Sequence, residues 1–183
     1  SSVKLYLDTY VPTYADYTPY NKKIKEFSTG MKRKLQIFAA ITHKAKLLLL
    51  DEPTSGLDVV AREQMLTLLR EYMETEGRAI LISSHLSGDL ETFCDDIYLI
   101  QKGTITFHEE MDRLLDAYGL LKVSEAVYKK MDKSHIICRK KENFGWSCLT
   151  DQKAYYQMHN PEIVIEKGSV DELILLMAGG ERI

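Results

Sequence analysis

The sequence has 183 residues, of which 45% are hydrophobic and 28% are charged, a composition typical of a globular protein without a membrane span. Its formal net charge of −3 argues against nucleic-acid binding, which usually needs a basic surface. Three cysteines without C-x-x-C spacing favour a reducing compartment over a disulfide framework or a metal site.

Residues 28–43 predict an amphipathic helix. Ser28 stands where an N-cap belongs, and residues 21–27, just before the cap, are typical of a short basic helix or connector. Helical spacing places four side chains on one face of this helix, namely Leu35, Phe38, Ala39 and Thr42.

Two short apolar runs predict strands that are buried on both faces. Residues 47–50 are four leucines, and residues 79–82 read Ala-Ile-Leu-Ile. Runs of this kind are typical of parallel strands inside a covered sheet. A helix that Asp58 caps and that runs to about residue 76 lies between them, so the three elements predict a right-handed βαβ crossover. Its predicted inner face consists of Met65, Leu68, Leu69 and Tyr72.

The remaining sequence predicts a hairpin and then a small α+β domain. A short helix at 87–94 precedes hairpin strands at 97–101 and 104–107, which turn at Lys102-Gly103, and a helix at 109–118 follows. From residue 120 the order β-α-β-β-α-β is that of the split-βαβ, ferredoxin-like pattern. Its predicted strands are 120–123, 135–139, 146–150 and 163–166, its helices are 124–131 and 153–158, and a capping box at Ser169 and Glu172 opens a last helix that runs to about 177.

Residues suited to phosphate chemistry follow both predicted strands. Asp51 and Glu52 come directly after the first strand, and His85 comes after the second. Loops at the carboxyl ends of parallel strands gather at the ligand crevice. One carboxylate there can hold Mg²⁺, and an imidazole can hydrogen-bond a phosphate. Ser28 and Gly30 at a helix start can offer backbone N–H groups to phosphate. Each feature alone is also typical of a turn, a surface histidine or a capped helix.

The order of these segments resembles the ABC-type ATPase family. Phe27-Ser28-Thr29-Gly30-Met31 stands in the place of the family's Leu-Ser-Gly-Gly-Gln signature and keeps its serine and its second glycine. The leucine run with Asp51-Glu52-Pro53-Thr54-Ser55-Gly56-Leu57-Asp58 resembles the Walker B strand and D-loop, and Ser83-Ser84-His85 resembles the H-loop.

The resemblance implies a fold, two domains and site roles. It implies a partial P-loop NTPase-type α/β domain with a mostly parallel sheet in residues 1–118, and an α+β accessory domain in residues 119–183. Asp51 would hold Mg²⁺, Glu52 would be the general base or orient water, and His85 would contact the γ-phosphate of ATP. The residues implied to face the ATP of an opposite subunit or the dimer seam are Ser28, Gly30 and Asp58.

By the same resemblance, the function is ATP hydrolysis that powers an ABC transporter, in a bacterial exporter subgroup. The implied partners are a second nucleotide-binding subunit, packed head to tail, and a transmembrane permease, and no nucleic acid is implied. The implied location is cytoplasmic, on the inner face of the cell membrane, where the permease would hold the subunit. The phosphate-binding loop G-x-x-x-x-G-K-[ST] is absent, because no two glycines of the sequence are five positions apart. We expect a piece of a longer protein that is inactive by itself.

Two alternatives remain open. The chain could be a non-catalytic, degenerate ABC module that binds or regulates, which would fit the absent loop and the altered signature. It could also be an ABC ATPase of translation or DNA repair, although such proteins usually carry tandem domains, coiled coils or basic surfaces. For the accessory domain we favour packing or dimerisation, with Trp146, Tyr155 and Tyr156 as core or interface aromatics.

Overall fold

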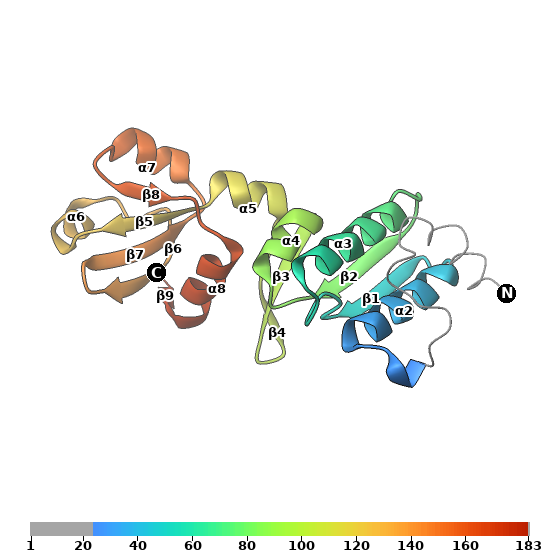
Figure 1. Cartoon of the computed structure of the whole chain (residues 1–183). Helices are drawn as coiled ribbons and strands as arrows, with labels where there is room; N and C mark the ends of the chain where they lie inside the picture. The colour runs from blue at the N-terminus through green and yellow to red at the C-terminus, as the bar shows by residue number, and fades with distance from the viewer. Residues whose placement is uncertain (1–23, 183) are drawn as a thin grey trace. The chain divides into compact units, whose positions relative to one another are not determined.

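The computed structural model describes residues 24–182, and its packing divides them into two compact units on either side of a boundary between residues 89 and 90 (Figure 1). The first described element is the short 3₁₀ helix η3 (Ile24–Glu26). It falls within the predicted connector, of which residues 21–23 lie outside the described residues.

The first long helix among the described residues is α2 (Thr29–Thr42), and Ser28 caps it as predicted. The side chains that α2 buries are Lys34, Ile37, Phe38 and Ile41, so only Phe38 of the four residues predicted to share a face is buried. Apolar residues occur on more than one side of this helix, so spacing alone leaves the inner face ambiguous. Packing against α3 determines which face of α2 is buried.

The βαβ unit forms as predicted. Strands β1 (Leu47–Asp51) and β2 (Ala79–Ser83) pair in parallel from Leu47↔Ala79 to Asp51↔Ser83. Between them runs α3 (Val59–Met73), which Asp58 caps. The six side chains that α3 buries include the whole predicted inner face, namely Ala61, Met65, Leu66, Leu68, Leu69 and Tyr72.

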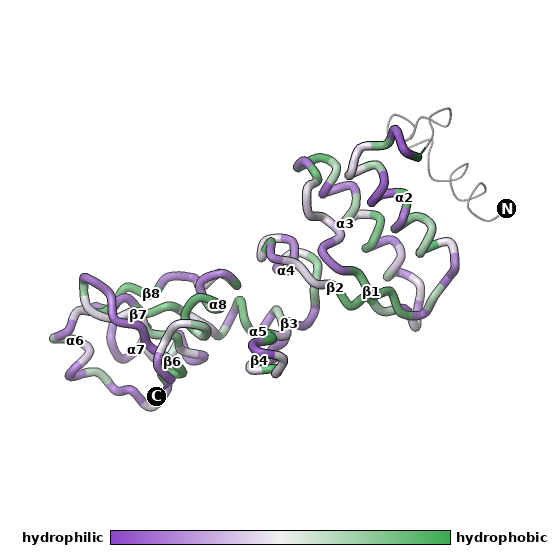
Figure 2. Tube along the Cα trace, turned by 90° about the horizontal axis from the view of Figure 1, so that it is seen from below, coloured by the Kyte–Doolittle hydropathy of each residue, from purple (hydrophilic) through white to green (hydrophobic). Residues whose placement is uncertain are grey.

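The prediction that both strands are buried on both faces is wrong for the described structure. Helices α2 and α3 lie on one side of the two strands, which Figure 2 shows as a green, apolar pair. Leu48 is buried, whereas Leu49 is 69% exposed and Leu81 is 61% exposed. Alternate side chains of a strand point to opposite faces, so the uncovered face is the one that carries Leu47, Leu49 and Leu81.

The C-terminal unit begins within α4 (Ser87–Phe93) and continues as a hairpin. Strands β3 (Asp96–Gln101) and β4 (Thr104–Glu110) pair antiparallel, and φ is positive at both turn residues, 50° at Lys102 and 76° at Gly103. Such a two-residue turn matches the right-handed twist of its strands. The next helix, α5 (Met111–Ala117), starts later than predicted, because residues 109 and 110 still pair with β3.

The rest of the unit has the predicted split-βαβ topology. Its antiparallel sheet has the order β8-β5-β7-β6-β9, so β7 separates the two strands that α6 joins, and β5 separates the two that α7 joins. The last helix opens with the predicted capping box, and β9 was not predicted. The elements are β5 (Gly119–Val123), α6 (Glu125–Lys130), β6 (Ile136–Glu142), β7 (Gly145–Thr150), α7 (Lys153–His159), β8 (Val164–Glu166), α8 (Val170–Gly179) and β9 (Glu181–Arg182).

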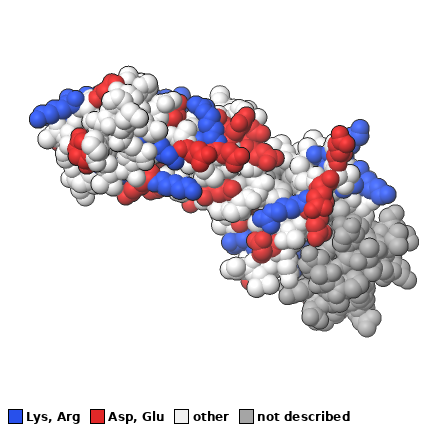
Figure 3. All heavy atoms as spheres, turned by 90° about the horizontal axis from the view of Figure 1, so that it is seen from above, with Lys and Arg blue, Asp and Glu red and all other residues white. Residues whose placement is uncertain are grey.

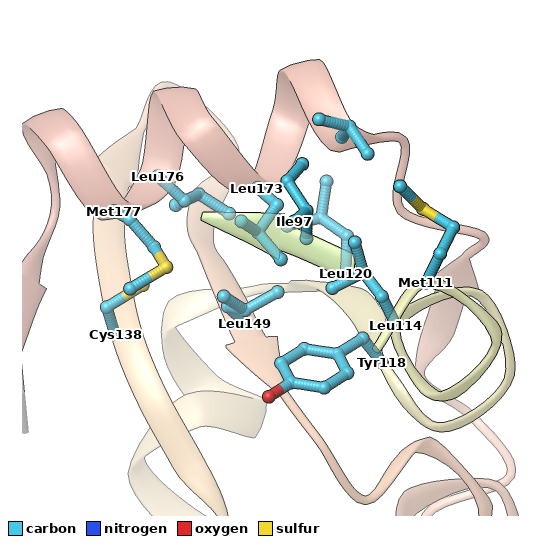
Figure 4. Packing of buried hydrophobic residues seen from close by; sticks show 11 residues of the cluster. Ile97, Met111, Leu114, Tyr118, Leu120, Cys138, Leu149, Leu173, Leu176 and Met177 are labelled. Carbon is cyan, nitrogen blue, oxygen red and sulfur yellow. The ribbon is translucent and has the colours of Figure 1, made fainter. Parts of the chain in front are cut away.

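Both faces of this sheet are covered. On one face Leu121 and Cys148 pack against Tyr128 of α6 and Tyr156 of α7. The opposite face packs against α8, as Figure 4 shows for Leu173, Leu176 and Met177 over Leu120, Leu149 and Cys138. An irregularity between Ile136 and Cys138 of β6 places these two residues on opposite faces, although regular strand alternation would put them on the same one.

The two packed units divide at a different place from the predicted domains. Ile97 of β3 and Met111 and Leu114 of α5 share one core with β5, β7 and α8. The hairpin and α5 therefore belong to the C-terminal unit by packing. A boundary between residues 118 and 119, drawn from family resemblance, stays a prediction.

Charged side chains of both signs share the described surface. On the face drawn in Figure 3, Lys and Arg side chains lie among Asp and Glu side chains. Local pairs such as Arg70 with Glu63 and Lys140 with Glu142 are solvent-exposed or partly so, and pairs of this kind contribute little stability. Within residues 24–182, no helix combines the length and the apolar character needed to cross a membrane.

Candidate functional site

The candidate site lies at the carboxyl ends of β1 and β2. These strands run parallel with Asp51 opposite Ser83, so the segments that leave them start side by side. The backbone N–H of Glu52 donates to the carbonyl of Ser83 at 3.0 Å, which extends the pairing by one step. The residues predicted from two separate motifs, Asp51-Glu52 and His85, thus emerge at one edge.

A serine links the two strand ends. The hydroxyl of Ser83 donates to Oδ1 of Asp51 and also accepts from the N–H of Glu52 at 3.2 Å. One hydroxyl can do both, since it carries one donor and two acceptor positions. The Asp51 carboxylate is therefore held at the strand end with its second oxygen left out of this bond.

Glu52 and His85 form a direct pair. Nδ1 of His85 lies 2.7 Å from Oε2 of Glu52, and the side chains are 64% and 32% exposed, respectively. Glu52 has a φ of 49°, in the left-handed region that non-glycine residues seldom occupy. Backbone strain of this kind gathers at functional sites, where surrounding contacts hold it in place. Here the two bonds from its N–H to Ser83 hold it.

The start of α2 forms a second group of candidate residues. Ser28 accepts from the N–H of Met31 at 3.2 Å and thereby caps the helix. Gly30 lies so close to the D-loop-like segment that a Cβ added to it would be 3.0 Å from Cδ2 of Leu57. A glycine here lets the helix start approach that segment, and Arg33 donates to the carbonyl of Ser55 in the same place.

Asp58 and Lys34 tie α2 to α3. Asp58 accepts from the N–H of Ala61 at 2.8 Å and caps α3. Lys34 is buried, and its Nζ donates to Oε1 of Gln64 at 3.1 Å. Burial lowers the pKa of Lys34, and the negative charge of Asp58 opposes that effect. The predicted D-loop aspartate is thus a helix cap in the described structure.

The candidates therefore fall into two groups. Asp51, Glu52 and His85 lie together at the strand ends, whereas Ser28 and Gly30 lie at the start of α2 beside the segment before Asp58. Among the described residues, no hydrogen bond joins the α2 start to the Glu52–His85 pair.

Curated relatives match about half of the chain. YdbJ of Bacillus subtilis (strain 168), an uncharacterized ABC transporter ATP-binding protein, is 40% identical over 99 residues, which are 54% of this chain and 32% of YdbJ. The lantibiotic transport ATP-binding protein SrtF of Streptococcus pyogenes is 37% identical over 91 residues, 50% of this chain and 39% of SrtF. The linearmycin resistance ATP-binding protein LnrL of Bacillus subtilis (strain 168) is 42% identical over 81 residues, 44% of this chain and 26% of LnrL.

Solved structures and a family profile agree with these relatives. An ATP-binding subunit of an ABC transporter superposes with a TM-score of 0.54 at 26% identity, over 62% of this chain and 47% of that one. A nucleotide-free ATP-binding cassette from an ABC transporter shares the fold, with a TM-score of 0.51 at 19% identity over 60% of this chain and 41% of that one. A profile described as "AAA domain, putative AbiEii toxin, Type IV TA system" matches residues 20–88.

Over about half of its length, the chain is homologous to ABC transporter ATP-binding proteins. The family resemblance and the P-loop NTPase-type α/β fold predicted from the sequence are thereby confirmed. The matched segment is 32% of YdbJ and 34% of YtrB, another ABC transporter ATP-binding protein of Bacillus subtilis. What the ABC protein as a whole does therefore remains a matter for proposal.

The donor set of the candidate site suits Mg²⁺ only together with other ligands. Among residues 24–182, no three His, Cys, Asp or Glu side chains gather into a group that could hold a metal. Mg²⁺ commonly binds one or two carboxylates, phosphate oxygens and water, without a complete protein cage. An exposed Asp51 at a strand end, held by Ser83, fits that manner of binding.

Two sets of contacts at the candidate site were not predicted from the sequence. Ser83 had no role beyond marking the strand end, yet it binds both Asp51 and Glu52. Thr54 and Asp89 were also unassigned, and they form a buried hydrogen bond. A serine that ends a strand and a threonine inside the D-loop-like segment were the available signals. The partner of each could not be predicted without the register of β1 and β2.

Proposed function

We propose that this chain is part of an ATP-hydrolysing subunit that powers an ABC membrane transporter. One observation carries the proposal: the 2.7 Å contact of Glu52 with His85 at the carboxyl ends of two parallel strands. It is supported by the homology to ABC ATP-binding proteins and by the AAA-domain profile, whose match over residues 20–88 includes both strands and both loops.

Each residue of the strand-end group has a proposed role. Asp51 holds Mg²⁺, which when bound supplies charge neutralisation for the phosphates of ATP. Glu52 accepts a proton from the attacking water or orients it, and its carboxylate has a free oxygen beside the one that faces His85. The imidazole of His85 keeps Glu52 in place and contacts the γ-phosphate. Phosphoryl transfer depends mainly on such positioning and charge stabilisation.

The second group would act on another subunit. In the proposed head-to-tail dimer, Ser28 and the amides near Gly30 contact the ATP held by the opposite subunit. Helix α2 is long enough for its positive end to attract phosphate, and its first N–H groups are available beyond the cap. Asp58 lies at the dimer seam and caps α3, so its position is fixed on a rigid helix.

We further propose an exporter on the inner face of the cell membrane, bound there through a permease. The names of two relatives, a lantibiotic transport protein and a linearmycin resistance protein, support export of compounds of this class. The C-terminal unit is proposed to act in packing or dimerisation.

The test measures Mg²⁺-dependent ATP hydrolysis by the full-length gene product that contains these residues. Glu52→Gln removes the base but keeps the shape of the side chain, so we expect kcat to fall by about a hundredfold or more and ATP-bound dimers to accumulate. Glu71→Gln on the exposed side of α3 is the matched control, with activity unchanged. Near wild-type turnover in Glu52→Gln would refute the base assignment.

A second measurement distinguishes the proposed ATPase from the alternative of a non-catalytic, degenerate ABC module. The sequence of the gene product upstream of Ser1 shows whether it contains a G-x-x-x-x-G-K-[ST] loop. A full-length protein that has no such loop and does not bind ATP would be a degenerate ABC module.

A further inference from the structure

A buried polar link lies behind the candidate site. Thr54 is fully buried and Asp89 is 7% exposed, and the hydroxyl of Thr54 donates to Oδ2 of Asp89 at 2.6 Å. Hydrogen bonds to a carboxylate are short and strong. Removing a buried partner leaves the other group unsatisfied away from water, which is costly.

This link joins the two segments that carry the exposed pair. Thr54 lies two residues after Glu52, in a turn closed by bonds from Ser55 N to Glu52 O and from Leu57 N to Thr54 O, each 3.2 Å long.

On the other segment, Asp89 lies four residues after His85. Its N–H donates to the carbonyl of Leu86 at 3.1 Å, and Leu86 N donates to Oγ of Ser84 at 3.0 Å. The segment that carries His85 is thereby tied to the residue that meets Thr54.

A third element approaches the same carboxylate. Nε of Arg62, on α3, lies 3.9 Å from Oδ2 of Asp89 and is buried without a hydrogen-bond partner among the described residues. That separation allows an ion pair but is too long for a hydrogen bond. A shift of roughly 1 Å would satisfy the nitrogen, so Asp89 can receive donors from both the turn and α3.

The contact between the exposed side chains of Glu52 and His85 restrains the two loops only weakly. His85 is 64% exposed and Glu52 is 32% exposed, and ion pairs in contact with water contribute little to the free energy of folding. The buried bond of Thr54 with Asp89 is protected from solvent. The stronger restraint on the two loops is therefore the buried one.

We propose that Thr54 and Asp89 are positioning residues, whose buried hydrogen bond sets the placement of Glu52 relative to His85. Arg62 extends the same restraint to the helix that Asp58 caps. The catalytic consequence of this inference rests on the proposed ATPase function, whereas the restraint on the two loops can be measured without it.

The experiment compares Thr54→Val with Thr54→Ser in the full-length gene product. Valine keeps the shape but lacks the hydroxyl, whereas serine restores the donor. Thr150→Val is the matched control, because Thr150 is also fully buried and donates to the carbonyl of His135 at 2.7 Å, in the C-terminal unit. Backbone hydrogen exchange reports the loops, and MgATP hydrolysis reports kcat and KM separately.

In Thr54→Val we expect the amides of residues 84–89 to exchange hydrogen about tenfold faster than in the wild type. A tenfold change corresponds to the net free energy of about one hydrogen bond. We expect kcat to fall about tenfold with KM changed less than about twofold, because positioning acts on the chemical step. Thr54→Ser restores both values to within about threefold. Asp89→Asn, which keeps an acceptor oxygen without the charge, gives a smaller loss in the same direction and replaces Thr54→Val if that variant does not fold.

The outcomes separate this inference from the proposed function. Unchanged exchange at residues 84–89 in Thr54→Val overturns the inference, as does an equal effect of Thr150→Val on exchange and kcat. Faster exchange with rescue by Thr54→Ser supports the restraint. If the wild-type protein does not hydrolyse ATP, the proposed function fails, and the exchange data alone decide whether the restraint exists.

Discussion

Gly145 begins β7 under a constraint that only glycine meets. Its φ is 144°, a conformation that side-chain-bearing residues rarely adopt. A Cβ at this position would press on the backbone of the β5–α6 junction, against the carbonyl of Val123 and 2.8 Å from Cα of Ser124. Backbone atoms cannot rotate away as a flexible side chain can, so Gly145→Ala must shift one strand end against the other.

The expected cost has two parts. Strain at such a φ is about 1 to 3 kcal/mol, and overpacking adds about 1 to 3 kcal/mol. We therefore expect a loss of about 4 kcal/mol in the free energy of unfolding of the C-terminal unit. With a urea dependence of about 2 kcal/mol per molar, the unfolding midpoint should fall by about 2 M.

The assay follows Trp146 fluorescence during urea unfolding of the full chain. Trp146 is the one tryptophan in the sequence and stacks on Tyr128 with ring centroids 4.9 Å apart, so its signal reports this unit. Gly168→Ala is the control, because its Cβ would meet nothing within 4 Å and its φ is not in the glycine-favouring range. A midpoint for Gly145→Ala within about 0.3 M of the control would refute the argument from backbone contact.

Two further predictions concern titrating groups. The backbone and hydroxyl of Ser134, and then the hydroxyl of Tyr155, donate to Asp132 and lower its pKa from 3.8 to about 2, so the folded state binds fewer protons than the unfolded chain in that interval. The stability that these bonds contribute is complete above pH 3.8 and is lost as the pH falls toward 2. The difference between the urea midpoints at about pH 6 and pH 2.5 should therefore be smaller in Asp132→Asn than in the wild type. An equal difference in the two proteins would contradict this. Burial raises the pKa of Cys148 to about 12 and that of Cys94 to about 11. At pH 8 the reaction with Ellman's reagent should therefore be slower in the folded protein than in urea, on the order of a thousandfold for Cys148 and a hundredfold for Cys94. Fast labelling without urea would show that these thiols are accessible.

Local chemistry made much of the fold predictable. Ser28, Asp58 and Ser169 each cap the helix that the sequence assigned to them. Each decision involves atoms within a few residues, because a cap bonds an N–H two or three positions away. The hairpin turn at Lys102-Gly103 followed in the same way from Gly103, since glycine tolerates positive φ.

Part of the site was also within reach of the sequence. The carboxyl ends of neighbouring parallel strands meet at one edge, so Asp51, Glu52 and His85 were expected to lie near one another. The 2.7 Å contact of Glu52 with His85 agrees with that expectation of proximity. The roles of these residues remain proposals that the ATPase assay tests.

Other features depended on how distant segments pack. The inner face of α2 could not be chosen from spacing, since apolar side chains lie on several of its sides. The irregularity in β6 that sends Ile136 and Cys138 to opposite faces has no signal in an apolar run. The hairpin and α5 joined the C-terminal core through Ile97 and Met111, which local pattern could not assign to either unit.

The sequence by itself determined the family resemblance, the order of most helices and strands, and the edge at which the candidate residues gather, because these follow from short-range chemistry and from motif order. Only the tertiary structure decided the partners of Ser83, Thr54 and Asp89. Thr54 and Asp89 are 35 positions apart along the chain, and side chains so far apart meet only after the register of β1 and β2 and the path of the following loops are set.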